Sequence, residues 1–439
     1  CLTSLCQSDF CLTIFILSHK GRHKKRVFFL DGEIFMNRIL PFIISMAICI
    51  PGVAISFFHG GLSPFVSAIL CGIAIFGASF VLTWTCEAAQ LDMPQAVAIA
   101  VVAFIAVLPE YAVDMYFTWM AGQDPDSPYS HYAIANMTGA NRLLIGVGWA
   151  AIALIFAARY HGGIVLPDDK RTDVLFLAIA TLYALLIPLK GSLTLLDGAV
   201  FLAIYVAYVF IIARRPVAEE EPEGPALAIT GLPKRKRFWV MGGLFLFSAL
   251  VILCNAEPFS ESLVASGKLL GINEFLLVQW LAPIASEAPE FIIALMFAFR
   301  GNASLALGSL LSSKLNQWTL LVGMIPGVYA VSSGAVMPPI NLDSHQLQEI
   351  FLTAGQSIFA VALLLNLRLS AMEGAVLFIL FVAQLSSPFY DFVLENALGL
   401  PHDPLRLHNI FAWLYLTLAF LMFCKNRNFI PSVLRAFRP

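Results

Sequence analysis

The sequence predicts an all-α, polytopic helical membrane protein with about 12 transmembrane helices. Of its 439 residues, 59% are hydrophobic and only 12% are charged, which is more apolar surface than a soluble core can bury. Apolar runs of about 20 residues, the length that crosses a bilayer, recur along the whole chain. Two segments far apart in the sequence also resemble one another, which predicts an internal repeat.

The composition also narrows the chemistry. A formal net charge of −2 provides no basic field that would favour nucleic acid. Eight cysteines, none of them in a CxxC pair, predict neither a zinc site nor a disulfide framework. We therefore expect inorganic cations and the lipid bilayer as partners, and no cofactor; no feature of the sequence indicates an oligomeric state.

The apolar runs divide the chain into two repeat units with one extra helix at each end. The units are 65–213 and 238–390; the extra transmembrane helices lie in 36–64 and in 391–439, where a basic tail follows. A polar linker, 214–237, joins the units and is too short to be a domain. The predicted spans are 39–57, 65–85, 95–121, 131–157, 173–189, 193–213, 238–256, 272–299, 302–325, 349–366, 370–387 and 407–424.

The first 35 residues differ from the rest of the chain. They contain the basic cluster SHKGRHKKR and have no clear structural period. The pattern that follows favours a start at Met36, so we interpret 1–35 as a non-native upstream extension or a disordered tail. A basic cytoplasmic tail is the alternative.

The distribution of Lys and Arg predicts the orientation. Cytoplasmic loops are enriched in basic residues, and the linker 214–237 and the C-terminal tail both contain several. The opposite side has few basic residues, and its loop GQDPDSPYS is acidic. We therefore expect both termini in the cytoplasm. The lack of soluble domains beyond the linker favours a prokaryotic inner (plasma) membrane.

The two related segments are AFIAVLPEYAVDMYFTWMAG (103–122) and APIASEAPEFIIALMFAFRG (282–301). Each contains Ala-x-Ile-Ala, a Pro-Glu pair, an apolar helix and a closing Gly, and each is followed by a helix rich in small residues. One helix precedes each pair and two follow, which gives five spans per unit. Because an odd number of spans reverses the direction of the chain, the units are predicted to be inverted repeats.

Each Pro-Glu helix carries two acidic residues on one face. Glu110 and Asp114 are four residues apart, and Glu287 and Glu290 are three apart. A carboxylate at the middle of a membrane costs about 2.5–3.5 kcal/mol, so it needs a function and a partner. We therefore predict that four carboxylates from two helices converge on a cation.

The prolines support this interpretation. Pro109 and Pro289 are interpreted as helix-breaking, because each removes a backbone donor and frees a carbonyl about one turn earlier. Carboxylates and free carbonyls form the all-oxygen environment that Na+ and Ca2+ prefer. Broken helices at the midplane of inverted repeats are also where secondary transporters bind their substrates.

The helix after each Pro-Glu helix supplies uncharged oxygens, although these polar residues would equally form a packing seam with interhelical hydrogen bonds. A second alternative makes each carboxylate a structural anchor paired with a base, in which Arg142 and Lys314 neutralise two of the four as counter-ions. The predicted cation-binding residues are Glu110, Asp114, Asn136, Asn141, Glu287, Glu290, Ser309, Ser313 and Lys314.

The two Pro-Glu helices with their small-residue partners resemble the alpha repeats of the calcium/cation antiporter superfamily, which includes the sodium/calcium exchangers. The family pattern is approximately G-T-S-x-P-E, then G-N-x-x-G-S-N-x-x-N, and ANMTGAN (135–141) keeps part of the second motif. The resemblance covers roughly 65–390. It implies that Glu110 and Glu290 are the central metal ligands, and that a helix pair slides across a rigid bundle during alternating access.

The sequence also departs from that pattern. The first G-T-S is replaced by IAV (105–107) and the second by ASE (285–287), while the second G-N-x-x-G-S-N-x-x-N becomes GSLLSSKLNQ (308–317). Fewer neutral oxygens and the nearby ammonium of Lys314 make a poorer site for several sodium ions. Lys314 would either occupy one cation position permanently or itself release a proton.

The predicted function is a secondary active cation antiporter that moves Na+ or Ca2+, with protons as a possible counter-substrate. The alternative is a transport-inactive scaffold or sensor, in which Lys314 and Arg142 lock the acidic cage. No Ser-His-Asp, Cys-His or H-E-x-x-H pattern occurs, and the Pro-Glu helices contain no histidine, so we do not expect an enzyme.

Overall fold

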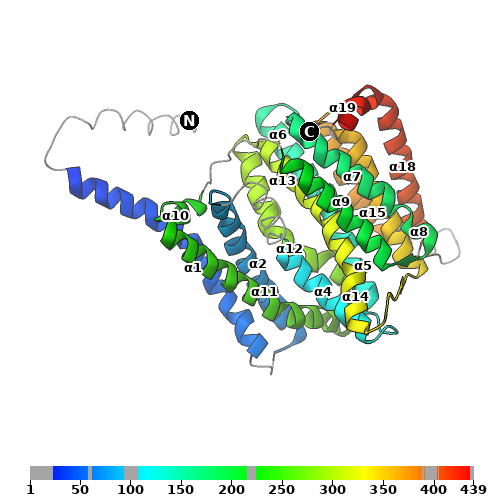
Figure 1. Ribbon diagram of the computed structural model, residues 1–439, viewed down its shortest axis with the longest axis horizontal. Helices are drawn as coiled ribbons and strands as arrows, with labels where there is room; N and C mark the ends of the chain where they lie inside the picture. Colours follow the sequence, from blue (N-terminus) through cyan, green and yellow to red (C-terminus); the bar gives the residue numbers. More distant parts are fainter. Residues whose placement is uncertain are drawn as a thin grey trace.

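The computed structural model describes residues 23–57, 62–92, 107–214, 224–387, 390, 403 and 405–435, with side chains from residue 38 onward. These residues are almost entirely helical, as the apolar runs predict. Figure 1 shows a large bundle, with a smaller group of long helices lying at one side of it.

The smaller group joins the beginning of the chain to the helices around the linker. Three of its long helices pack on one another, and α2 contacts α11 along most of its length. α1 begins at His23, so residues 23–35 continue a helix instead of forming the predicted disordered tail, and residues 1–22 lie outside the described part. The group consists of α1 (His23–Phe57), α2 (Pro64–Ala89), the short α10 (Ala226–Thr230) and α11 (Lys234–Leu270).

An ion pair fixes this group at one end. The Arg237 guanidinium, at the start of α11, donates to both carboxylate oxygens of Asp92 just beyond α2, at 2.5 and 2.6 Å. These hydrogen bonds hold the pKa of Asp92 below its ordinary value, because they favour the ionised carboxylate. Arg237 also donates to the Thr230 carbonyl at 2.8 Å, which ties the end of α10 to the same point.

The first repeat contributes a series of helices to the large bundle. A π-helical segment lies in the middle of its predicted span 131–157. Its elements are α4 (Leu108–Gln123), α5 (Tyr129–Leu143), the π-helical η1 (Leu144–Trp149), α6 (Ala150–Tyr160), β1 (Ile164–Val165), η2 (Asp168–Lys170), α7 (Arg171–Ala184), α8 (Ile187–Lys190), β2 (Ser192–Leu193) and α9 (Leu195–Ile212).

The second repeat follows the same order, and one further long helix packs against it at the side of α15. Its elements are α12 (Glu274–Phe299), α13 (Ala303–Asn316), the π-helical η3 (Gln317–Leu321), α14 (Val322–Ser333), β3 (Ile340–Asn341), α15 (Ser344–Leu364), β4 (Arg368–Leu369), α16 (Ala371–Leu385), and then α18 (Arg406–Asn426), η4 (Arg427–Phe429) and α19 (Ile430–Leu434).

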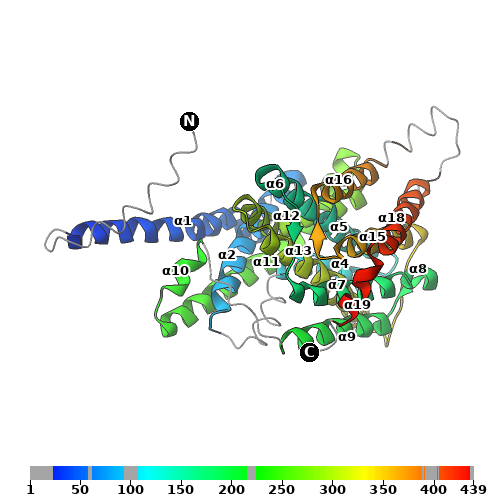
Figure 2. The same ribbon diagram turned by 90° about the horizontal axis from the view of Figure 1, so that it is seen from above.

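Details of the backbone repeat between the two units. In each unit the π-helical segment directly follows the predicted site residues of the helix after the Pro-Glu helix. Thr194 with Asp197, and Ser370 with Glu373, form capping boxes at the start of α9 and α16. The strands pair across the units, β1 with β4 and β2 with β3, both antiparallel. Two pseudo-equivalent halves are therefore interlocked, and Figure 2 shows them as one body beside the projecting α1.

Nine helices of the described residues are long and apolar enough to cross a membrane. The other three predicted spans correspond to α4, whose predicted beginning lies outside the described residues, to the continuous helical run from α13 to α14, and to the shorter α16. The count of twelve therefore remains a prediction.

A close helix crossing connects the two repeats. Gly139 of α5 faces the backbone of α12, and a methyl group added there would lie 1.8 Å from the carbonyl oxygen of Gln279. Gly139 is therefore required for packing, since small residues let the backbones of membrane helices approach closely. The crossing brings α5 against α12 at Gln279, about two turns before Glu287.

We expect Gly139→Ala to destabilise the folded protein by about 1–3 kcal/mol, because the Gln279 backbone cannot yield without moving α12. Thermal unfolding of the purified protein in detergent measures this. Gly242→Ala in α11 is the matched control, since nothing lies within 4 Å of its added methyl group. Equal melting temperatures for the two variants would contradict the proposed crossing.

Candidate cation-binding site

Four acidic side chains from α4 and α12 converge inside the bundle. The Glu110 carboxyl lies within hydrogen-bonding distance of the Glu287 carboxyl and within electrostatic range of Glu290 and Asp114. Glu110, Asp114 and Glu287 are each at most 3% exposed, while Glu290 is half-buried. The structure thus brings the four predicted carboxyls together, with Glu287 instead of Glu290 as the direct neighbour of Glu110.

The prediction that the prolines break helices is wrong for Pro289, whereas the residues before Val107 lie outside the described part and leave the prediction for Pro109 untested. Pro109 lies in the first turn of α4, where the missing backbone donor costs nothing. Pro289 lies inside α12, which continues as a helix through both Pro283 and Pro289. An interior proline removes one hydrogen bond, and the rest of a well-packed membrane helix tolerates that loss. The chain therefore weakens its backbone beside Glu290 without ending the helix.

Each repeat supplies polar partners from its own second helix. Asn136 donates to Asp114 at 2.7 Å in the first repeat. In the second, Ser313 donates to Glu290 at 2.7 Å and Gln317 donates to Glu287 at 2.5 Å. These hydrogen bonds fix one oxygen of each carboxyl in place and leave the other oxygen free to bind.

Several buried oxygens at this place lack a donor. Apart from the carboxyl–carboxyl contact, none of them accepts a hydrogen bond from a described residue. Buried acceptors in folded proteins are almost always paired, so a group of unpaired ones indicates a missing positive partner. Oxygen donors of this kind suit a hard cation. The oxygens are Glu110 Oε1, Asp114 Oδ2, Asn136 Oδ1, Glu287 Oε2 and Gln317 Oε1.

Lys314 and Asn141, which occupy equivalent positions in the two repeats, meet directly. The Lys314 ammonium donates to Asn141 Oδ1 at 2.7 Å and lies 4.5 Å from the centre of the Trp318 ring. It is fully buried and interacts electrostatically with Glu287 and Glu110. Within the described residues, however, it is not within ion-pair distance of any carboxylate, so it does not lock the cage.

Arg142 is not the counter-ion of the cage. It pairs with Glu349 of α15 and lies 5.0 Å from the centre of the Trp280 ring. The reason is helical geometry, because one residue turns the side chain by about 100°, away from the face of α5 that carries Asn141. The locked scaffold that Arg142 and Lys314 would form together is therefore not what the structure shows.

The predicted place of Ser309 among the cation-binding residues does not agree with its exposure. It is exposed, one turn before Ser313 on α13, whereas its counterpart Asn136 in the first repeat is buried against Asp114. Thr138 donates back to the Ile134 carbonyl at 2.7 Å, so it serves its own helix.

A sequence model of the family described as sodium/calcium exchanger protein matches residues 62–214 and 240–389. This is more than half of the chain and includes all four converging carboxyls. The chain belongs to the sodium/calcium exchanger family. It is therefore an integral membrane protein and a cation antiporter by family, as the sequence predicted.

Two relatives and two solved structures are similar to this chain. CaxA of Alkalimonas amylolytica, assigned as an antiporter, is 22% identical over 66% of this chain and 86% of its own. The sodium/calcium exchanger MaX1 of Methanosarcina acetivorans is 25% identical over 33% of this chain and 39% of its own. Both relatives are named as transporters.

The crystal structure of the H+/Ca2+ exchanger CAX has a TM-score of 0.84 and 37% identity, covering 92% of this chain and 98% of CAX. The structure of native YfkE has a TM-score of 0.59 and 14% identity over 79% of this chain and 98% of YfkE, which shows the fold alone. The match to the CAX structure confirms the predicted fold class, an all-α polytopic membrane protein, and the two inverted five-helix units stay a prediction.

Some residues of the site carried weaker signals in the sequence. Gln317 and Asn316 are uncharged polar residues of the second repeat, in the helix after the Pro-Glu helix. Their hydrogen-bond partners, Glu287 and Tyr111, can be identified only from the folded structure. Glu349 gave no signal as the partner of Arg142, because the two residues are 207 positions apart. Glu349 is the first residue of the predicted span 349–366, where an acidic residue is unremarkable.

Two serines on one helix provide a test of these positions. We expect Ser313→Ala to weaken Ca2+ binding by about tenfold, because a hydrogen bond to a charged group contributes about 1.5–3 kcal/mol. Ser309→Ala should change it by no more than about 0.5 kcal/mol, as exposed substitutions usually do. The Ca2+-induced rise in melting temperature reports both values. A larger effect at Ser309 would refute the assignment.

Proposed function

We propose that this exchanger moves Ca2+ in one direction and protons in the other across a prokaryotic inner membrane, with Glu110, Asp114, Glu287 and Glu290 as its binding site. One observation carries the proposal. Four carboxyls, three of them buried and that of Glu290 half-buried, converge where, among the described residues, Lys314 supplies a single ammonium. The local excess of acidic groups requires positive charge from outside the chain.

The physical argument concerns charge compensation. Burying an unpaired charge is costly, so the ionised carboxyls persist only with a cation or with protons bound to them. A calcium ion and a pair of protons deliver the same charge to the same oxygens. Calcium and protons therefore compete for one set of ligands, and the binding of one favours the release of the other. This mutually exclusive binding is what an exchanger requires.

The contact between Glu110 and Glu287 supports protons as the second substrate. Two carboxyls within hydrogen-bonding distance need a proton between them, because two negative charges at that distance repel strongly. A calcium ion placed between the same oxygens would replace that proton. The H+/Ca2+ exchanger CAX, at 37% identity over most of the chain, has the exchange reaction that this arrangement suits.

Sodium is the less suitable second substrate. The family pattern has two hydroxyl residues before the first Pro-Glu pair, and this chain has IAV there. Lys314 takes the place of an asparagine, and its ammonium, hydrogen-bonded to Asn141, occupies space that a sodium ion would need. We infer that Lys314 is a fixed internal cation, which reduces the number of ions that the site takes up.

Access to the site is proposed from the side of the hairpin between α12 and α13, which the distribution of basic residues places in the cytoplasm. Glu290 is half-buried and Ser309, one turn closer to that hairpin than Ser313, is exposed. Asp114 and Glu110 are closed off. The packed pair α2 and α11 is then the group that moves across the bundle to open the other side.

Neutralising either glutamate should abolish exchange. In Glu110→Gln and Glu290→Gln we expect Ca2+ affinity to fall about 10- to 100-fold, because each removes a charge-assisted contact of about 1.5–3 kcal/mol. Calcium uptake into everted vesicles under an imposed pH gradient measures this. Glu274→Gln, in the first turn of the same α12, is the control. Calcium uptake by both site variants at the rate of the unaltered protein would contradict the proposal.

Replacing the lysine should change ion selectivity. In Lys314→Asn, which restores the residue of the family pattern, we expect Na+ to raise the melting temperature, while the parent protein shows no such response. The reason is that the ammonium no longer occupies the cation position. Lys314→Met, which removes the charge without adding an oxygen, should not gain the sodium response. A sodium response in the unaltered protein would contradict the role given to Lys314.

A further inference from the structure

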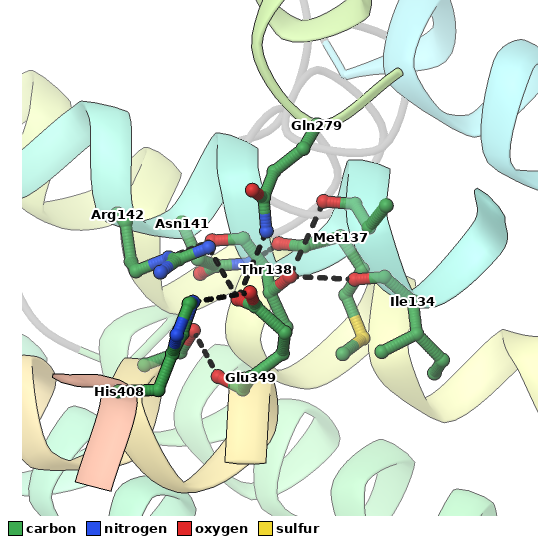
Figure 3. A network of polar contacts seen from close by, with 10 residues as sticks. Ile134, Met137, Thr138, Asn141, Arg142, Gln279, Glu349 and His408 are labelled. Atoms are coloured by element: carbon green, nitrogen blue, oxygen red, sulfur yellow. Dashed lines mark hydrogen bonds and ion pairs between the residues drawn. The ribbon is translucent and has the colours of Figure 1, made fainter. Parts of the chain in front are cut away.

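A second polar cluster lies where α15 meets α18, and the transport site does not use it. Figure 3 shows its centre, the Glu349 carboxylate, with the side chains of Arg142, Gln279 and His408 directed toward it. Glu349 is 1% exposed. His408 belongs to α18, which lies beyond the part of the chain that matches the family.

One oxygen of Glu349 is held in place and the other faces histidine. Oε2 accepts from the Arg142 guanidinium and from Gln279 Nε2, the latter at 2.9 Å. Oε1 lies 3.0 Å from His408 Nε2. A carboxylate fixed through one oxygen by neighbouring donors is how metal-binding side chains are oriented in proteins.

His345 completes a set of three ligand atoms. It is four residues before Glu349 on α15, so both side chains lie on one face of that helix. Each of His345, Glu349 and His408 offers one ligand atom, a ring nitrogen or a carboxylate oxygen, and these three atoms lie within 4.8 Å of one another. The 3.0 Å between Glu349 and His408 is close to the roughly 3.3 Å that separates two ligands of a tetrahedral Zn2+.

The imidazoles have unused capacity. His408 Nδ1 is buried without a hydrogen-bond partner among the described residues. His345 packs edge-on against Phe275, with the ring centres 4.6 Å apart, which restricts its rotation. Two restrained imidazoles beside a fixed carboxylate are a preformed arrangement.

The local charge also accommodates a cation. Glu349 and Arg142 neutralise each other, and the Asp343 carboxylate acts on His345 from the preceding loop. With both histidines neutral, the surroundings of the three ligands are negative by one charge. A divalent ion therefore meets a compensating group instead of a net positive pocket.

We propose that His345, Glu349 and His408 bind a transition-metal ion of the Zn2+ class and thereby fasten α18 to α15. Two nitrogen ligands and one oxygen ligand favour Zn2+ or Co2+ over Ca2+ and Mg2+, which prefer oxygen alone. The site is separate from the carboxyl cage and does not depend on the transport reaction.

The test uses full-length protein in detergent that carries Glu110→Gln and Glu290→Gln, so that the transport site contributes little. We expect Zn2+ to raise its melting temperature by about 3 °C or more. Co2+, bound to the same ligands, should give the visible absorption of a four-coordinate nitrogen and oxygen site. Failure of both signals in this protein overturns the proposal.

Three further variants assign the signals to residues. His345→Gln and His408→Gln should each remove the Zn2+ shift and the Co2+ absorption; glutamine in place of His408 keeps a donor for Glu349 and so preserves folding. His131→Gln is the control, because His131 lies 3.6 Å from Asp343 and outside the three ligands. Retention of both signals in His345→Gln and His408→Gln would disprove the site.

Discussion

The excess of buried negative charge between α4 and α12 is the constraint on which the rest of the structure depends. Carboxyls in a membrane interior demand donors and cations; the next helix of each repeat supplies donors, and the second repeat alone adds an ammonium, that of Lys314. Asn136, Ser313 and Gln317 each fix one oxygen. The close crossing at Gly139 holds the two repeats near enough for the remaining oxygens to act together.

The repeat symmetry explains where the glutamates are, and a departure from that symmetry explains which of them touch. Glu110 and Glu290 are equivalent, but the second acid follows Glu110 in α4 and precedes Glu290 in α12. Val113 and Phe117 of α4 pack in one apolar cluster with Val278 and Ala282 of α12. The extra acid of α12, Glu287, thereby comes to lie beside Glu110.

The sequence was informative where a residue type is rare in its setting. A carboxylate or proline in an apolar run is conspicuous, so the site helices, the repeat and the converging acids could be predicted from pattern alone. The failures concern direction. Ser309 and Asn136 occupy equivalent positions with opposite exposure, and Arg142 turns toward α15 instead of the cage. Side-chain direction depends on which neighbours cover a helix face, and one sequence does not contain that information.

The cross-paired strands have a consequence for biosynthesis. β1 and β2 are made early, yet their partners β4 and β3 follow only in the other half of the chain. The first repeat therefore leaves the ribosome with two unpaired strands, which pair only when the second repeat has been made. Neither half can complete its strand pairs alone, so both loops close only after the second half has been synthesised.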